Sequence, residues 1–398
     1  MNILFICAFI PYPPHGGAYQ RTYNLLKHIA KNNDVYLIGF IKEKNDPENA
    51  NYLKKICKEV HAFYLPDDWS RISLVKSLFL NLFSQLPYTA QKYYSMQARQ
   101  TIAKLIRRVN FDILQCDMID LAGYIYDYNP KATVLVNHNV ESTLILRHAE
   151  VEKNPLKKWF FYLQYKKLLR YERKMCPMFK CCVAVSELDK QQLQLISPQA
   201  RFSVVPNGVD VDYFQPQKTQ VEKNTLIFAG RTDWLPNIDG LKFFYQEILP
   251  LIKKEIKDVR LTIIGKARTN NDIGLPLTEN VTHLGFVEDV RPYIGKAAVY
   301  IVPLRIGGGT RLKILDAMAM GKAIVSTSIG AEGIDVTHGK NILIADTPED
   351  FSKQVIRVLN DSNLRESLGK EGRKLVEEKY SWDIIGKKMD EIYNTTHI

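Results

Sequence analysis

The sequence lacks several features that would point to a familiar class of protein. Its six cysteines form no CxxC pair, so neither a paired-cysteine zinc site nor a disulfide framework is expected. No apolar run reaches the ~18 residues of a membrane-spanning helix. The chain begins MNILFICAFI, without the basic start or small-residue cleavage site of a signal peptide, so we expect a first strand there. These absences predict a cytoplasmic protein, soluble or peripheral at the membrane, with reduced and buried cysteines.

Length and charge set broad limits on the fold and the partner. A chain of 398 residues with 46% hydrophobic composition can bury a large core and is expected to form two domains. The formal net charge of +11 favours an anionic partner, and nucleotides, nucleic acids and acidic lipids all fit this description. No recognisable nucleic-acid module is present, so we expect no nucleic-acid partner.

Short apolar, β-branched runs alternate with helix-length stretches along the whole chain, which predicts parallel sheets with crossover helices. The pattern stops at the turn Pro206-Asn207-Gly208 and then starts again. We therefore predict two α/β domains, each a doubly wound parallel sheet. The polar stretch 215–224 is the expected linker, because it lacks apolar periodicity. The expected runs are 2–9, 34–40, 59–65, 112–117, 133–138 and 181–186, then 225–230, 260–266, 281–285, 299–303, 323–327 and 341–345.

The segment RIGGGTRLKILDAMAMG, from Arg305 to Gly321, carries the strongest signal for a ligand. An apolar run, a three-glycine turn and a helix beginning near Thr310 form an anion site, because backbone N–H groups and the positive helix end point at one spot. Arg311 and Lys313 in the first turn are unfavourable beside the helix dipole unless an anion binds there. Asp316 is placed to accept hydrogen bonds from vicinal hydroxyls such as those of a ribose. The alternative is a tight glycine turn and a surface carboxylate.

Three further sites follow predicted strands, where ligands of parallel sheets bind. Gly230-Arg231 places an arginine, suited to bidentate phosphate binding, after the first strand of the second half. Gly16-Gly17 permit a ligand to approach the backbone before a helix. His138 follows the strand 133–138 and could bind a sugar hydroxyl or a departing phosphate. Each of the three also has a structural alternative: a solvated loop, a turn and a lone histidine.

Two segments have the composition of a surface that meets an anionic membrane. Residues 153–180 carry nine basic residues, one acid and six aromatic residues from Trp159 to Tyr171, as interfacial helices do. A domain helix with aromatics packed inward remains an equal alternative. Residues 71–83, RISLVKSLFLNLF, could form an amphipathic helix at an acceptor or lipid site, or belong to the core.

Taken together, the motifs resemble the family 4 retaining glycosyltransferases, and specifically a subgroup with a GGGTRLK sequence. The resemblance spans nearly the whole chain, and VPNGVD and the last block are its most specific parts. It implies the GT-B architecture of two facing Rossmann-like domains, here 1–205 with a C-terminal helix crossing back over 380–398, and 206–379. The motifs are PPHGG, VNHNVES, VAVSELD, VVPNGVDVDYF, FAGRTDWLPNIDGLKFF, LGFVEDV and PLRIGGGTRLKILDAMAMGKAIVSTSIGAEG.

The resemblance also assigns roles to single residues. It implies that Asp316 holds the nucleotide ribose, and that Val287 lies near the base. The diphosphate and sugar would meet Gly16 and Gly17, the Gly230-Arg231 pair, the lysine Lys313 and the turn Gly308, Gly309, Thr310 and Arg311. Among these, Arg231 and Arg311, together with His138 as the histidine of the first domain, would be the catalytic groups. No metal and no cofactor are expected, because cations of the chain would neutralise the leaving group.

The activity implied is transfer of a hexose-type sugar from a UDP- or GDP-sugar to a saccharide or lipid-linked acceptor, in surface polysaccharide biosynthesis, with retention of configuration. Two departures stand out: Gly308 replaces the first of two family glutamates, and Pro236 replaces a common lysine. Two rival functions stay open. A nucleotide-sugar epimerase of the same architecture would act without an acceptor, and a nucleotide-binding adaptor would not act at all.

Overall fold

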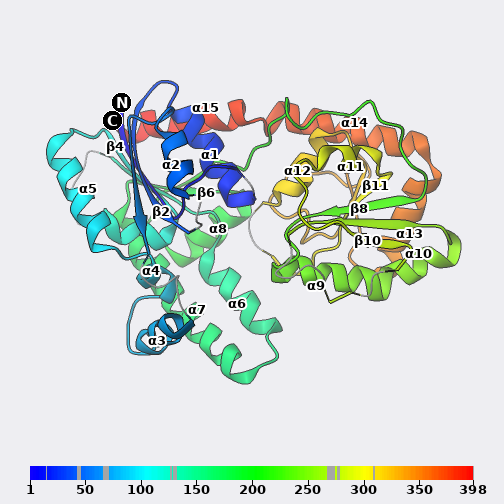
Figure 1. Ribbon diagram of the computed structural model, residues 1–398, viewed down its shortest axis with the longest axis horizontal. Coiled ribbons are helices and arrows are strands. Elements are labelled where there is room, and N and C mark those ends of the chain that lie inside the picture. Colours follow the sequence, from blue (N-terminus) through cyan, green and yellow to red (C-terminus); the bar gives the residue numbers. More distant parts are fainter. Residues whose placement is uncertain are drawn as a thin grey trace. The chain divides into compact units, whose positions relative to one another are not determined.

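The computed structural model describes residues 1–14, 16–42, 46–65, 71–125, 128, 132–266, 274–275, 278–307 and 310–397. The chain forms two compact units, each with its own parallel sheet (Figure 1). The first unit comprises Met1–Pro206 and Ile385–Ile398, and the second comprises Asn207–Ile384. The last helix, α15 (Trp382–His397), therefore begins in the second unit and continues in the first.

The first unit has a seven-stranded sheet in its described part, in the order β3-β2-β1-β4-β5-β6-β7. All of its strand pairs are parallel. The strands are β1 (Asn2–Cys7), β2 (Asp34–Ile41), β3 (Glu59–Tyr64), β4 (Ile113–Asp117), β5 (Thr133–Val136), β6 (Cys181–Ala184) and β7 (Phe202–Val204). The helices are α1 (Gly17–Ile29), α2 (Asp46–Leu53), α3 (Arg71–Leu82), α4 (Tyr88–Lys92), α5 (Met96–Arg108), α6 (Glu141–Val151), α7 (Pro155–Met175) and α8 (Glu187–Ile196), with 3-10 turns η1 (Ile119–Tyr124) and η2 (Cys176–Met178).

The second unit repeats this arrangement with six strands in its described part, in the order β10-β9-β8-β11-β12-β13. These pairs are parallel as well. The strands are β8 (Thr225–Ala229), β9 (Arg260–Ile264), β10 (Val281–His283), β11 (Val299–Val302), β12 (Ile324–Ser326) and β13 (Leu343–Ile344). The helices are α9 (Leu235–Phe243), a π-helical turn η3 (Phe244–Ile248), α10 (Leu249–Glu255), α11 (Arg291–Lys296), α12 (Leu312–Ala319), α13 (Pro348–Asn360) and α14 (Ser362–Lys379).

In each unit the first strand of the chain lies inside the sheet, and the later strands are added first on one side of it and then on the other. In the first unit β1 lies between β2 and β4, and in the second β8 lies between β9 and β11. Doubly wound folds bind ligands at the carboxyl ends of the two central strands, where the strand order reverses. The prediction of two doubly wound parallel sheets is confirmed.

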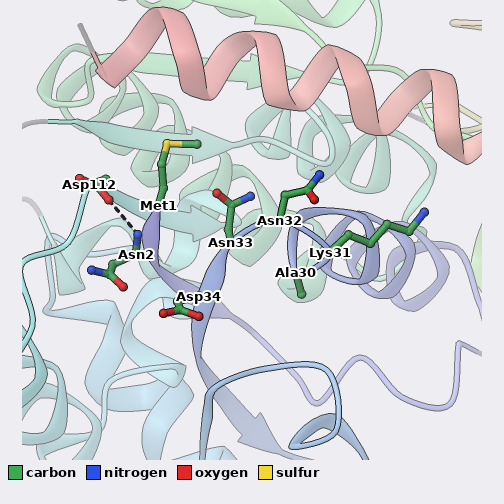
Figure 2. A pocket seen from close by; sticks show the side chains of 8 residues that line it. All are labelled: Met1, Asn2, Ala30, Lys31, Asn32, Asn33, Asp34 and Asp112. Carbon is green, nitrogen blue, oxygen red and sulfur yellow. Dashed lines mark hydrogen bonds between the residues drawn. The ribbon is translucent and has the colours of Figure 1, made fainter.

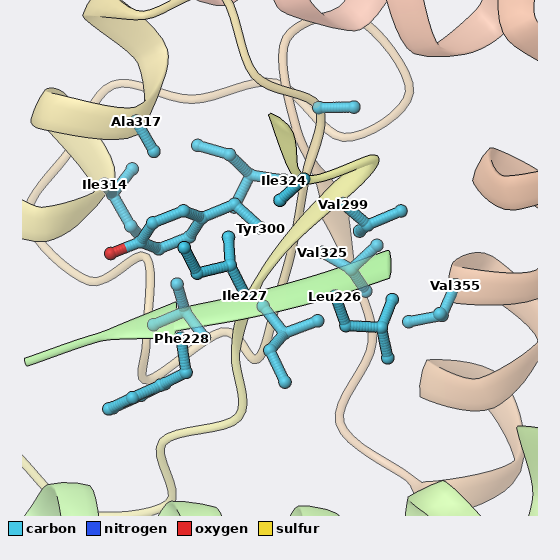
Figure 3. Packing of buried hydrophobic residues seen from close by; sticks show 14 of the residues in the cluster. Leu226, Ile227, Phe228, Val299, Tyr300, Ile314, Ala317, Ile324, Val325 and Val355 are labelled. Carbon is cyan, nitrogen blue, oxygen red and sulfur yellow. The ribbon is translucent and has the colours of Figure 1, made fainter. Parts of the chain in front are cut away.

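The core of the second unit shows why these sequences form buried strands. Ile314 and Ala317 of α12 lie beside Tyr300 of β11, whereas Val355 of α13 lies near Leu226 of β8 (Figure 3). Helices thus cover both faces of the sheet, and side chains of both kinds of face must be apolar. This is the physical reason for the continuous apolar runs in the sequence, in place of alternation.

All six cysteines are free and buried, as expected: Cys7, Cys57, Cys116, Cys176, Cys181 and Cys182. Burial raises the pKa of Cys57 to about 12, and it raises the pKa of Cys7 and Cys116 as well. Such thiols are inert packing groups.

The structure differs from the sequence-based expectations at two places. The stretch 215–224, expected as the linker, belongs to the second unit, where the Glu222 N–H donates to the Lys296 carbonyl over 2.9 Å. The strand β7 was not expected, because three residues are too few to show a pattern.

Candidate functional site

The carboxyl edge of the second sheet gathers the cations that the sequence singles out. Strand β8 runs directly into Gly230 and Arg231, and its neighbour β11 leads to the segment that ends at α12. Arg311 is the N-cap of α12, and Lys313 lies in its first turn. Thr310 therefore precedes the helix, which starts two residues later than expected. Because β8 and β11 are adjacent, residues 80 positions apart in the chain meet at one edge.

Lys313 is the best-defined cation of this edge. Its side chain is only partly exposed, and its Nζ donates a 2.8 Å hydrogen bond to Asn237 Oδ1 of α9. Nζ also lies 4.1 Å from the ring centroid of Phe228, within cation–π range. Burial, and next the charge of Arg311, lower the pKa of Lys313 to about 7. A bound anion would reverse this shift, because it favours the charged amine.

The two arginines are held by carboxylates of the same unit. Arg231 makes a bidentate ion pair with Asp233, with Nε to Oδ1 at 2.9 Å and Nη2 to Oδ2 at 2.8 Å. Its side chain is 65% exposed, so a ligand in solvent can reach it. Arg311 is mostly buried, and its Nη2 lies 3.9 Å from Glu332 Oε2. A diphosphate would therefore compete with Asp233 and Glu332 for these guanidinium groups.

Asp316 lies one turn into α12 and faces a partly buried environment. Burial raises the pKa of Asp316 to about 8, and its charge acts on the nearby Tyr300. Within the described residues, the Asp316 carboxyl accepts no hydrogen bond. A carboxyl in this state can accept hydrogen bonds from the hydroxyls of a ligand or donate one to it.

Glycine is required at two positions because the cations lie so close. A Cβ on Gly230 would come within 2.5 Å of Lys313 Nζ, and a Cβ on Gly307 would clash with the guanidinium of Arg311. Gly308 and Gly309, also predicted site residues, lie outside the described residues. Thr310 is buried, and its carbonyl accepts from Asn207 Nδ2 over 3.3 Å.

Val287, the residue expected near a base, follows β10 and packs partly buried against the core of its unit. The structure therefore places Val287 four residues beyond the carboxyl end of β10.

The first unit has its own set of predicted residues at the carboxyl edge of its sheet. Gly16, with φ of 110°, is the N-cap of α1, and Gly17 is the first residue of that helix. A Cβ on Gly16 would meet nothing within 4 Å, so the backbone there is open to a ligand. The N-terminal end of α1 leaves its first N–H groups available to an anion.

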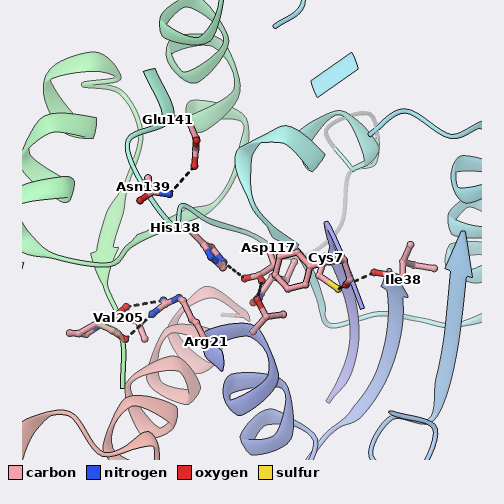
Figure 4. A network of polar contacts seen from close by, with 12 residues as sticks. Cys7, Arg21, Ile38, Asp117, His138, Asn139, Glu141 and Val205 are labelled. Atoms are coloured by element: carbon pink, nitrogen blue, oxygen red, sulfur yellow. Dashed lines mark hydrogen bonds and ion pairs between the residues drawn. The ribbon is translucent and has the colours of Figure 1, made fainter. Parts of the chain in front are cut away.

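His138 lies beside Asp117, the last residue of β4. His138 Nε2 lies 3.2 Å from Asp117 Oδ1, and both side chains are buried. Thr22 of α1 donates a 2.5 Å hydrogen bond to the other oxygen, Oδ2. Figure 4 shows this network, with Arg21 beside it donating to the Val205 carbonyl over 2.8 Å. The carboxylate thus fixes the orientation of the imidazole, as it does for catalytic and ligand-binding histidines.

Opposing effects act on Asp117. Burial alone would raise its pKa, but His138, the Thr22 hydroxyl and the charge of Arg21 outweigh it, so the pKa of Asp117 lies below its usual value. The group is therefore a carboxylate at neutral pH. Sequence reasoning missed Asp117, although its place at the end of a buried strand was a usable signal.

A second group of carboxyls lies close to this network. The charges of Asp120 of η1 and Glu172 of α7 raise the pKa of Glu141 of α6, and the charge of Asp120 also raises that of Glu172. Burial is the largest cause, and the pKa of Glu141 reaches about 8 and that of Glu172 about 7. Glu172 is satisfied by Ser142, whose N–H and hydroxyl both donate to it. This group therefore holds the start of α6 to α7.

A pocket at the opposite edge of the first sheet does not join these residues. It is lined by polar groups near the amino ends of β1 and β2, including Asn2, Asn33 and Asp34 (Figure 2). The Asn2 N–H donates to Asp112 Oδ2 over 2.8 Å there. Ligands of parallel sheets bind at the carboxyl edge, so we assign this pocket no role.

Two observations bear on metals and membranes. Asp210-Val211-Asp212 has the D-x-D spacing of a metal motif, but Asp210 Oδ1 accepts from the backbone of Asp212 and Tyr213 in an exposed turn. In the described part of the chain, no group of three or more His, Cys, Asp or Glu residues could hold a metal ion. Nor does any described helix combine the length and apolarity needed to cross a bilayer.

Known proteins resemble this chain along its whole length. A 44.6 kDa protein of the cps region of Klebsiella pneumoniae is 24% identical over 95% of this chain and 96% of its own. CapM, a capsular polysaccharide biosynthesis glycosyltransferase of Staphylococcus aureus, is 26% identical over 48% of this chain and 53% of its own, so this match spans about half of that relative. The Anabaena protein HepE, solved with UDP and glucose, shares the fold, with a TM-score of 0.68, 14% identity and coverage of 99% of this chain and 100% of HepE.

Two family models complete the comparison. Residues 223–361, which contain the cations of the second unit, match the model for glycosyl transferases group 1. Residues 15–213, half of the chain and almost the whole first unit, match the model for Glycosyltransferase Family 4. The paired sheets, the cationic edge of the second unit and these matches agree, and the chain belongs to Glycosyltransferase Family 4, whose members are glycosyltransferases with the GT-B fold.

Proposed function

We propose that this glycosyltransferase moves a hexose-type sugar from a nucleoside-diphosphate donor to a hydroxyl of a saccharide or lipid-linked acceptor, with retention of configuration and without a metal. The observation that carries the proposal is the cationic edge of the second unit. Arg231, Arg311 and Lys313 come together there from two adjacent strand ends. A diphosphate has the charge and size to bind all three.

The residues of the site bind different parts of the nucleotide-sugar donor. Arg231, Arg311 and Lys313 neutralise the diphosphate, and Asp316 binds the ribose hydroxyls. Thr310 and the glycines before it contact the diphosphate and the sugar, while Val287 lies near the base. The first unit supplies the backbone at Gly16 and Gly17, and His138 binds the sugar or the departing phosphate. What supports these roles is the cluster of cations and the family resemblance of each motif.

The chemistry follows from this charge arrangement. The bond between the anomeric carbon and the phosphate oxygen breaks, and its electron pair stays on the nucleoside diphosphate, where the three cations stabilise the growing charge. The acceptor hydroxyl attacks the face that the leaving group vacates and loses its proton to a phosphate oxygen. His138 would donate a hydrogen bond to the sugar or to the departing phosphate, and Asp117, 3.2 Å from its Nε2, would help to position the imidazole.

The biological role proposed is synthesis of a surface polysaccharide or glycolipid on the cytoplasmic side of the membrane. The two Klebsiella and Staphylococcus relatives support it by their descriptions, and HepE supports UDP-glucose chemistry as one possibility among nucleotide sugars. We further propose that the chain belongs to a subgroup marked by the GGGTRLK sequence, in which Gly308 replaces a sugar-contacting glutamate; the resemblance of this segment supports it.

Ligand-induced stabilisation tests the proposal at little cost. The melting temperature is measured with UDP, GDP, ADP and their sugars, and transfer to saccharide and polyprenyl-linked acceptors is then followed by mass spectrometry. We expect stabilisation by one diphosphate, and a product with retained configuration by NMR, equally in EDTA. If no nucleotide stabilises the protein, the transferase proposal is wrong. Conversion of the donor without an acceptor would instead indicate an epimerase.

A further inference from the structure

Helix α3 and the residue after it present an apolar stripe to solvent. Val75, Phe79 and Phe83 are spaced by four residues and therefore share one face, and their exposed fractions are 66%, 59% and 77%. The rings of Phe79 and Phe83 pack edge to face with centroids 5.6 Å apart. Contiguous exposed apolar residues of this kind mark an interaction surface. Leu74, Leu80 and Leu86 are exposed beside the stripe.

The opposite side of α3 is fixed by buried polar contacts, so the helix is not free to turn its apolar face inward. Asn81 is fully buried, and its Oδ1 accepts from Gln164 Nε2 at 2.8 Å and from Lys167 Nζ at 3.2 Å. Its Nδ2 donates to Gln91 Oε1 over 2.7 Å. Burial lowers the pKa of Lys167, which shows that placing an amine there is costly. The chain thus uses a buried lysine of α7 to hold an apolar helix outward.

The sequences of α3 and of the first half of α7 carry charge of a single sign. Residues 71–86 and 153–171 contain basic side chains and no acidic one. Lys76 on α3 and Lys153, Lys157 and Lys166 on or before α7 are exposed. The first half of α7 adds exposed Leu156 and Trp159, at 77% and 57%. Apolar side chains flanked by lysines and tryptophan are the pattern of helices that lie in the interface of an anionic bilayer.

We propose that α3 and the first half of α7 dock on an anionic lipid surface, with Phe79 and Phe83 inserted among the acyl chains and the lysines against the headgroup phosphates. A second copy of this chain fits the surface poorly, because a two-fold interface would bring lysine against lysine. The inference does not depend on sugar transfer, so either proposal can fail alone.

The test uses the full chain without nucleotide and measures co-flotation with lipid vesicles. We expect binding to phosphatidylcholine vesicles containing ~30% phosphatidylglycerol, and weaker binding in ~0.5 M NaCl than in ~0.1 M. The double variant Phe79→Ser/Phe83→Ser should bind these vesicles at least about tenfold less. The double variant Lys153→Gln/Lys157→Gln, which changes two exposed lysines, should lose most of the salt dependence.

Leu195→Ser is the matched control, because Leu195 is an 84% exposed leucine of α8 in the same unit. It should bind vesicles as the unaltered protein does, and all variants should keep its melting temperature because the changed side chains are exposed. Equal flotation of the Phe79→Ser/Phe83→Ser variant and the unaltered protein would overturn the proposal. So would a dimer in sedimentation velocity that this variant converts to a monomer, because the surface would then join two copies.

Discussion

Lys313 Nζ and Asn237 Oδ1 lie 2.8 Å apart, although 76 residues separate them in the chain. The amide oxygen accepts from the lysine, and burial, followed by the charge of Arg311, lowers the pKa of this amine to about 7. Arg231 is likewise engaged by Asp233, and Arg311 lies near Glu332. Each cation proposed for the diphosphate thus has a polar or acidic neighbour in its own unit, with which a diphosphate would compete. The first three predictions below follow from this arrangement.

The first prediction concerns the charge of the site. Lys313→Met and Arg311→Ala should each weaken binding of the preferred nucleoside diphosphate by about 10- to 100-fold, because each removes a charge-assisted hydrogen bond. Binding of the nucleoside alone should change little. Isothermal titration with both ligands checks this. Arg260→Gln is the control, because it removes an exposed cation that pairs with Glu222 away from the site. Equal losses for nucleoside and diphosphate would remove the residue from its role.

The second prediction concerns pH. Since burial lowers the pKa of Lys313 to about 7, the amine is charged below pH 7 and increasingly neutral above it. A bound diphosphate favours the charged form, so binding should take up a proton near pH 8 and should weaken as the pH rises from about 7 to 9. Titration in buffers of different ionisation enthalpy measures the uptake. The Lys313→Met variant should show a smaller uptake, and an unchanged value would contradict the assignment.

The third prediction tests the glycine that makes room for Lys313. Gly230→Ala would bring a Cβ within 2.5 Å of Lys313 Nζ and would place it on a backbone with φ of 157°, so the amine must move and the backbone is strained. We expect weaker diphosphate binding, by about tenfold, together with a fall in melting temperature. Gly339→Ala is the control, because its φ of 78° strains the backbone as well while its Cβ would meet nothing within 4 Å. If the two variants bind alike, close approach at Gly230 is unimportant.

The fourth prediction concerns Asp316 and the ribose. Asp316→Ala should reduce the preference for a ribonucleoside diphosphate over its 2′-deoxy form, by about 5- to 30-fold, since one hydrogen bond to the ribose is lost. Competition binding with UDP and dUDP, or with the base that proves preferred, measures this ratio. Asp258→Ala changes an exposed carboxylate that pairs with Asn224, and it should leave the ratio unaltered.

The fifth prediction separates the first unit from donor binding. His138→Ala and Asp117→Asn should lower kcat by about 100-fold with little effect on affinity for the nucleoside diphosphate. Asp117→Asn should also lower the melting temperature, because His138 and Arg21 lose a buried negative partner. His61→Ala, at an ion pair with Glu59 on β3, is the comparison. A loss confined to donor affinity would place His138 elsewhere in the mechanism.

The sequence predicted the architecture well, because strands that are buried on both faces appear in the sequence as short apolar segments. Every expected strand from Asn2 to Ala345 has a counterpart in the structure. Most are short apolar runs, such as ILFIC in β1 and VYIV in β11. The sequence did not reveal the three-residue strand β7 or the boundary between the two units. Phe202–Val204 is a strand only because β6 pairs with it. The end of the first unit at Pro206 depends on packing, and Val209 and Phe214 join the core of the second unit.

The sequence predicted which residues of the candidate site would bind a phosphate, but not which side chains those residues contact. Glycines and cations after strands indicated where a phosphate would bind. The partner of Lys313 is Asn237 of α9, and the partner of His138 is Asp117 at the end of β4. No spacing rule connects Lys313 with Asn237. Residues 71–83 are a similar case, because their sequence fits both a core helix and a surface helix. The buried contacts of Asn81 show which side of this helix faces the protein.

The six buried thiols make this chain convenient for site-specific labelling. Reagents that attack thiolates require both access and a low pKa, and burial denies access to all six while raising the pKa of Cys7, Cys57 and Cys116. One cysteine introduced at an exposed position, such as Trp234 beside the donor cations or Val75 on α3, would then be the reactive one in the folded protein. A fluorescent dye could report on nucleotide or bilayer at that point without any native cysteine being replaced.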